Sequence, residues 1–146
     1  MTYFCVKIEI LQRVVALDIG LKRTGIAVGY SSIGIASGFT AVASNQLLEE
    51  LKRMHKEEPF SLVVIGKPLQ MNGEDSESTP FIEKKGRAIQ SELGLPLQWH
   101  DERFTSKMAS QALLAMNAKK SVRQSRLVID EVSATLILQS FFDKVL

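Results

Sequence analysis

The chain has 146 residues, of which 45% are hydrophobic, so it has the length and composition of one domain that buries its own core. Its net charge of +2 is too small to indicate a nucleic-acid partner by itself, and its single cysteine, Cys5, excludes an intrachain disulfide. It has no Cys/His cluster for zinc, no apolar run near the roughly 20 residues that span a bilayer, and no signal-peptide pattern, so we expect a cytoplasmic protein without membrane contact.

The first part of the chain predicts a three-stranded antiparallel meander. Residues 14–17 form an apolar run that leads into Asp18, and residues 26–29 follow after a polar turn in which Gly20 and Gly25 supply flexibility. Residues 33–42 predict the third strand. We expect one domain over residues 13–146, preceded by an extension over residues 1–12 that is either an added edge strand or a disordered arm.

The rest of the chain alternates between helices and strands. Apolar residues at helical spacing follow Ser44 and Asn45, either of which could cap the helix. The apolar run 62–66 predicts a buried strand, and residues 68–73 predict a loop. A helix over 79–93 stops at Gly94, and a short strand covers 95–99. A helix through Met108, a polar loop over 117–121, and a last helix to about residue 143, with capping-box spacing at 121–124, complete the chain.

This order predicts an α/β fold with a mixed five-stranded sheet, in which the meander is extended by two parallel strands and helices cover both faces. Sites in such sheets lie at the carboxyl ends of the parallel strands. Asp18 closes the first strand, and Asp101 and Glu102 follow the last one. Three acidic positions from two distant segments are therefore expected at one end of the sheet.

The last helix adds a fourth acidic position. Asp130 lies within an apolar stripe formed by Leu127, Ala134, Ile137 and Phe141. A carboxylate in such a stripe must be paired, protonated or bound to a cation. Glu131 also has apolar neighbours, so the helical wheel alone does not choose between Asp130 and Glu131.

Each carboxylate has an ordinary explanation when taken singly, as a turn residue, a helix cap or an ion-pair partner. Together they would repel one another unless cations bind between them. Oxygen ligands suit Mg²⁺ or Mn²⁺, and two such ions, about 4 Å apart, can clamp a scissile phosphate. His100 is close in sequence to this cluster, but we expect a structural role for it.

Three basic clusters are candidates for contacts with phosphates. For any one of them, ordinary solvated surface is the alternative interpretation. They consist of Lys22 and Arg23; Lys84, Lys85 and Arg87; and Lys119, Lys120, Arg123 and Arg126.

Four sequence blocks, in this order and at these spacings, resemble the YqgF/RuvX family, whose members are described as Holliday junction resolvases and as pre-rRNA nucleases. The resemblance covers about residues 13–143, nearly the whole chain. The blocks are 18–29 (DIGLKRTGIAVG), 65–73 (IGKPLQMNG), 101–106 (DERFTS) and 129–134 (IDEVSA). Where family members often have an Ala-Ala pair after the last acid, this chain has Ser133 and Ala134.

The resemblance implies a ribonuclease H-like fold and a metal-dependent nuclease. Asp18 and Asp130 match the first and last acids of the family, and the middle acid falls on Asp101 or Glu102, of which we favour Glu102 as the metal ligand. The implied catalytic set is Asp18, Asp101, Glu102 and Asp130, and the implied substrate contacts are Lys22, Arg23, Arg103 and Arg126.

Processing of the 5′ end of precursor 16S rRNA is the favoured function, and cleavage of four-way DNA junctions uses the same chemistry. Junction cleavage usually needs a two-fold dimer, and we expect a monomer or a weak homodimer. A non-catalytic RNA-binding assembly factor, acting on ribosome precursors, is the alternative from another class. An actin-like ATPase is disfavoured, because it needs two such domains.

Overall fold

The sheet begins with three consecutive antiparallel strands, β1 (Arg13–Ile19), β2 (Arg23–Tyr30) and β3 (Ile35–Ala43). Two parallel strands, β4 (Leu62–Pro68) and β5 (Leu97–Glu102), continue from β1, so the order is β3-β2-β1-β4-β5. The structure is a computed structural model that describes residues 12–68, 78–102 and 126–145. The predicted mixed five-stranded sheet is confirmed.

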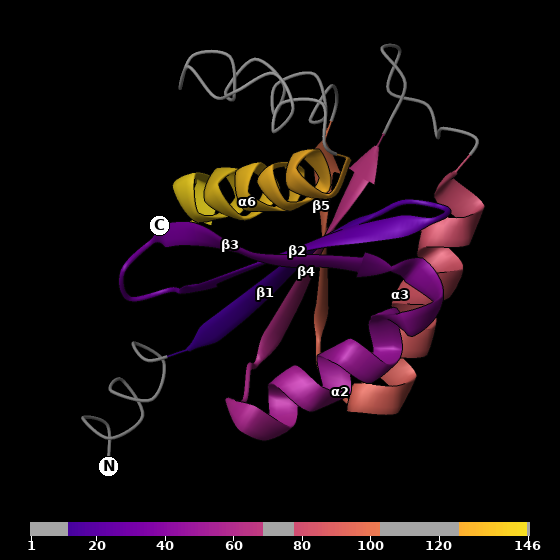
Figure 1. Cartoon of the computed structure of the whole chain (residues 1–146). Helices are drawn as coiled ribbons and strands as arrows, with labels where there is room; N and C mark the ends of the chain where they lie inside the picture. The colour runs from indigo at the N-terminus through magenta and orange to yellow at the C-terminus, as the bar shows by residue number, and fades with distance from the viewer. Residues whose placement is uncertain (1–11, 69–77, 103–125, 146) are drawn as a thin grey trace.

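Helices cover both faces of this sheet, as predicted. A short 3-10 helix, η1 (Ser44–Gln46), leads into α2 (Leu47–Glu57), which shares one face with α3 (Thr79–Leu93). The other face is covered by α6 (Arg126–Val145), as Figure 1 shows. Among the helices that the structure describes, none is long and apolar enough to cross a membrane.

The alternation of side chains along β1 decides which residues meet which helix. Val15, Leu17 and Ile19 belong to the apolar core beneath α2 and α3, whereas Val14 and Ala16 pack in the core under α6. Asp18 follows the second set, so it lies on the α6 face, at the carboxyl end of β1. Both faces of β1 are buried, because this strand is central in the sheet.

Most predicted boundaries agree with the structure. Helix α3 has the predicted bounds, and Gly94 ends it with a left-handed φ of 65°, a conformation that glycine adopts without a steric penalty. The strand predicted over 95–99 is instead β5 at Leu97–Glu102, because its parallel pairing with β4 continues through Lys67 opposite Asp101 and Pro68 opposite Glu102. Asp101 and Glu102 are therefore the last residues of the strand and do not follow it.

Two further expectations are wrong, and others concern segments that the structure does not describe. Neither Ser44 nor Asn45 caps α2: its N-cap is Gln46, without a side-chain hydrogen bond. The third strand begins at Ile35, later than predicted, because the chain turns through Gly34 with a φ of 73°. The extension up to residue 11, the loop 69–73, the helix through Met108, the polar loop 117–121 and the capping box at 121–124 all lie outside the described residues.

Candidate functional site

Asp18 and Asp130 are brought to the same place by the packing of α6 on the hairpin β1–β2. Asp18 is paired across the hairpin with Gly25. A Cβ atom built on Gly25 would stand 1.9 Å from the backbone oxygen of Asp130. The backbone of α6 therefore touches the sheet directly beside Asp18, and two of the predicted acidic positions, 112 residues apart in the chain (130 − 18), lie next to each other.

The position of Gly25 corrects one expectation. The sequence pattern assigned it to the turn, but it lies inside β2, and Gly34 and Gly94 are the glycines with positive φ in the described part of the chain. The turn consists of Leu21 and Lys22, closed by a hydrogen bond of 2.9 Å from the Gly20 amide to the Arg23 carbonyl. Gly25 is needed for the close approach of α6.

Asp130 is held by an ion pair with Arg23. The Arg23 Nε donates to the Asp130 Oδ2 over 3.2 Å, and the Asp130 side chain is 20% exposed. A carboxylate within the apolar stripe was expected to need a partner, and Arg23 supplies the positive charge. Arg23, predicted as a substrate contact, thus contacts one of the predicted acidic residues, and Lys22, the next residue in the turn, is exposed.

At the end of β5, Asp101 and His100 belong to opposite faces of the sheet. Leu97 and Trp99 pack against the core under α2 and α3, and Asp101 continues that alternation with an exposed side chain. His100 is on the α6 side, where its Nε2 and the Ser140 Oγ are 2.9 Å apart. Positions two apart in a strand belong to the same face of the sheet, so position 102 is on the same face as position 100, which is also the face of Asp18.

The predicted three-carboxylate cluster is not seen as a complete group. Among the described residues, no three His, Cys, Asp or Glu side chains gather as metal ligands. Asp18 and Asp130 lie together and Asp101 is on the opposite face, while the side chain of Glu102 lies outside the described residues. Arg103 and the side chain of Arg126 lie outside them as well.

Ser44 is a residue of this region that the sequence analysis assigned to another role. Its side chain is buried, and its hydroxyl donates to the Gly20 carbonyl over 2.6 Å and lies 2.9 Å from the Thr24 hydroxyl. Its amide donates to the Lys22 carbonyl over 2.8 Å. Ser44 therefore clamps the turn that carries Lys22 and Arg23, a long-range contact for which the sequence offers no local signal.

A five-stranded sheet of order β3-β2-β1-β4-β5, with an antiparallel meander, two parallel strands, and helices on both faces, defines a protein of ribonuclease H-like fold. Solved structures agree. "T. thermophilus RuvC in complex with Holliday junction substrate" matches with a TM-score of 0.55 at 10% identity, over 91% of this chain and 95% of that one. "Thermus thermophilus RuvC structure" matches with a TM-score of 0.50 at 12% identity, over the same shares. At these identities the likeness concerns the fold.

The family model described as "RuvX: Holliday junction resolvase" matches residues 12–144. The chain belongs to the RuvX family. A relative from Bacteroides fragilis (strain ATCC 25285), described as "Putative pre-16S rRNA nuclease", is 42% identical over 91% of this chain and 97% of its own length. Relatives with the same description from Flavobacterium psychrophilum and Porphyromonas gingivalis are each 41% identical, over 92% and 90% of this chain and 98% and 96% of their own.

Proposed function

We propose that this protein is a metal-dependent nuclease that processes the 5′ end of precursor 16S rRNA in the cytoplasm. The observation that carries the proposal is the contact of Gly25 with the Asp130 backbone, which brings the positions of Asp18 and Asp130, from distant parts of the chain, to the same end of the sheet. Two neighbouring acidic residues repel each other, and a cation bound between them would offset that cost, as Arg23 does in part for Asp130.

The donor chemistry of the site fits Mg²⁺ or Mn²⁺. Asp18, Glu102 and Asp130 would hold the metal, in our proposal as two ions, because their positions share the α6 face, whereas Asp101 is on the other face. Arg23 pairs with Asp130 in this structure, so a metal ion would compete with the guanidinium for that carboxylate. Bound metal would supply an activated water and stabilise the oxygen that leaves.

The other residues at the site have binding roles in this proposal. Lys22 and Arg23 neutralise phosphates of the substrate, and so do Arg103 and Arg126. Cations on a turn anchor a phosphate backbone without reading bases, so the choice of substrate depends on its shape. The names of the relatives favour pre-16S rRNA, and the description of the family model favours a four-way DNA junction.

A cleavage assay with three substrates tests the proposal. Precursor 16S rRNA, unrelated single-stranded RNA and a four-way DNA junction are each incubated with Mg²⁺, Mn²⁺ or EDTA. We expect metal-dependent cleavage near the 5′ end of the precursor and none in EDTA. Preferential cleavage of the junction would assign the protein to DNA recombination, and binding without cleavage in any metal would make it a non-catalytic assembly factor. Solution mass measurement of monomer against dimer accompanies the assay.

A further inference from the structure

We propose that the β1–β2 turn and the first half of α3 form one surface for the single-stranded segment that flanks the scissile phosphate, with Lys22 and Lys85 as its phosphate contacts and Ser44 as the positioning residue that joins them. This inference rests on the proposed function and adds the path of the strand. Its observations come from the turn, Ser44 and α3, and neither Ser44 nor Lys85 is among the residues assigned to the acidic site.

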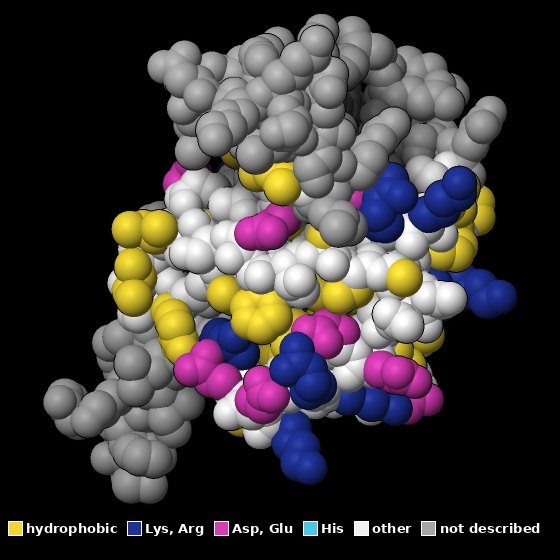
Figure 2. All heavy atoms as spheres, viewed as in Figure 1, with side chains coloured by type: hydrophobic (Ala, Val, Ile, Leu, Met, Phe, Trp, Pro, Cys, Tyr) yellow, Lys and Arg dark blue, Asp and Glu magenta, His cyan; other side chains and the backbone are white. Residues whose placement is uncertain are grey.

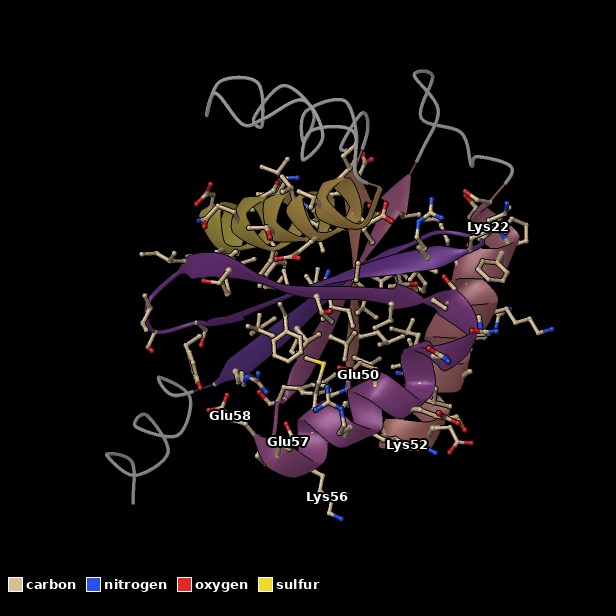
Figure 3. All side chains as sticks on the ribbon, viewed as in Figure 1. Lys22, Glu50, Lys52, Lys56, Glu57 and Glu58 are labelled. Carbon is tan, nitrogen blue, oxygen red and sulfur yellow. The ribbon has the colours of Figure 1, made fainter. Side chains whose placement is uncertain are left out.

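The two lysines are linked through a single residue. The Ser44 amide donates to the Lys22 carbonyl over 2.8 Å, and the Lys85 Nζ donates to the Ser44 carbonyl over 3.3 Å. Ser44 itself is 2% exposed, so this link is part of the core and not a surface contact. The turn and α3 are therefore held at a fixed separation. Figure 3 shows Lys22 at the tip of the turn.

Lys85 differs from the neighbouring cations on this side of the molecule. It is half-buried, and its Nζ lies 5.6 Å from the centre of the Phe81 ring. Within the described ranges, Lys22 and Lys85 make no ion pair with a carboxylate, whereas Lys67 and Arg87 both pair with Glu83. The ammonium group of Lys85 is instead placed by the Ser44 carbonyl and the Phe81 ring.

The arrangement suits a single strand. Lys and Arg side chains gather over the turn and α3 at the right of the view in Figure 2. A strand that binds at Asp18 and Asp130 passes the turn first, because Arg23 joins the turn to Asp130. Phosphates then meet Lys22 and Lys85 in succession, and a positively charged path that follows the backbone is typical of single-strand binding.

Binding of labelled single-stranded RNA of about 4, 8 and 16 nucleotides, lengths that bracket common single-strand site sizes, tests the surface by fluorescence anisotropy in EDTA. We expect Lys85→Met to weaken binding of the longest RNA several-fold and to flatten its salt dependence by about 0.7 of a slope unit, the value for one phosphate contact on a single strand. Binding of the shortest RNA should not change. Met keeps the apolar stem over Phe81 and removes only the charge, and Lys85→Arg should restore wild-type binding.

Two matched controls accompany these variants. Lys84→Met removes an exposed charge from the adjacent position of α3 and should bind every RNA like the wild type. Ser44→Ala keeps the backbone hydrogen bonds to Lys22 and Lys85 and removes the hydroxyl that donates to the Gly20 carbonyl, so it should loosen the turn and weaken binding of the longest RNA. Ser61→Ala should not, although Ser61 also donates to a backbone carbonyl, that of Arg13. Circular dichroism and melting show that each variant is folded.

The results separate this inference from the proposed function. If the wild type cleaves its substrate with metal while Lys85→Met binds the longest RNA with unchanged affinity and salt slope, the surface is overturned and the nuclease stands. If the wild type cleaves nothing but binding still depends on Lys85 and length, the surface stands and the nuclease is overturned. An equal loss for all three RNA lengths would place Lys85 at the acidic site and overturn the extended path.

Discussion

Gly25 and Asp130 touch through their backbones: a Cβ atom on Gly25 would lie 1.9 Å from the Asp130 oxygen and 2.3 Å from its carbonyl carbon. Because these are backbone atoms of a helix, no side-chain rotation can relieve the clash. The contact fixes the distance of α6 from the hairpin, and with it the distance of Asp130 from Asp18 on the paired strand.

Gly25→Ala should therefore separate the two carboxylates. We expect a loss of stability of about 1–3 kcal/mol or more from overpacking, and a loss of cleavage at temperatures where the variant is still folded. Gly29→Ala is the control, since its Cβ would meet the Phe142 ring at 2.8 Å, far along α6 from Asp130. It should lower the melting temperature and spare cleavage. Full activity of folded Gly25→Ala would show that the close contact does not serve the site.

Asp18→Asn should abolish cleavage and preserve the fold, because the amide has nearly the same shape and lacks the negative charge. A lost metal ligand costs several kcal/mol of transition-state stabilisation, so the rate should fall roughly a thousandfold or more. In the absence of metal the variant should melt at the same or a higher temperature, since Asp130 is close and one repelling charge is gone. Melting curves with and without Mg²⁺ are run beside the assay. A less stable but active variant would make Asp18 a purely structural residue.

Successive residues of β5 belong to opposite faces of the sheet, so we predict that Asp101 and Glu102 differ in role. Glu102→Gln should lower cleavage by a factor comparable to that of Asp18→Asn, whereas Asp101→Asn should keep most of the wild-type rate, because Asp101 belongs to the face of the sheet under α2 and α3. Isothermal titration with Mn²⁺ provides a second readout, in which only Glu102→Gln weakens binding. The reverse result would assign the metal to Asp101 and refute the argument from opposite faces.

Arg23→Gln should enlarge the effect of metal on stability. In the wild type, Arg23 already neutralises Asp130, so a metal ion must compete with the guanidinium for the carboxylate. The half-exposed ion pair itself contributes only about 0.2–1 kcal/mol, so the metal-free variant should melt slightly lower. Addition of Mn²⁺ should raise its melting temperature by more than it raises that of the wild type. Arg53→Gln, which breaks ion pairs on α2, is the control, and equal metal-induced shifts in all three proteins would contradict the prediction.

Ser133→Ala should stabilise the protein. The Ser133 side chain is fully buried in α6, and its hydroxyl has no hydrogen-bond partner in the part of the chain that the structure describes. Removal of an unsatisfied buried hydroxyl should add about 1 kcal/mol to the free energy of unfolding, and Ala is also the better helix former. Urea denaturation measures this change in the free energy of unfolding. Ser140→Ala on the same helix is the control. It removes the hydrogen bond between Ser140 and His100 and should destabilise the protein, and equal effects of the two substitutions would refute the reasoning.

Local patterns were enough to predict most of the sheet and helices. The apolar run that leads into Asp18 predicted β1, and the helical period followed by Gly94 predicted the bounds of α3. These features depend on residues close in sequence, such as a period of two in a strand or a left-handed glycine after a helix. The resemblance of four short blocks to the RuvX family supplied what the local patterns could not, namely the family, which the comparison confirmed.

Features that depend on residues far apart in the chain escaped prediction. Gly25 looked like a turn residue because the approach of α6, more than a hundred residues later, is invisible in its neighbourhood. The wheel of the last helix did not separate Asp130 from Glu131, and the contacts with Gly25 and Arg23 did. Ser44 looked like a helix cap, although its hydrogen bonds go back to Gly20 and Lys22. That Asp101 and Glu102 belong to the strand itself depended on the register between β4 and β5, which no single strand specifies.

The packing of α6 across the first strands also orders events during synthesis. The meander of β1, β2 and β3 leaves the ribosome early, with the apolar face of Val14, Ala16 and Ala27 uncovered, and the helix that covers this face is made about a hundred residues later. Contacts over such separations form slowly, and an uncovered apolar face is prone to aggregation meanwhile. Asp130 also arrives with this helix, so a nascent chain that has completed only its sheet lacks one of its two neighbouring carboxylates.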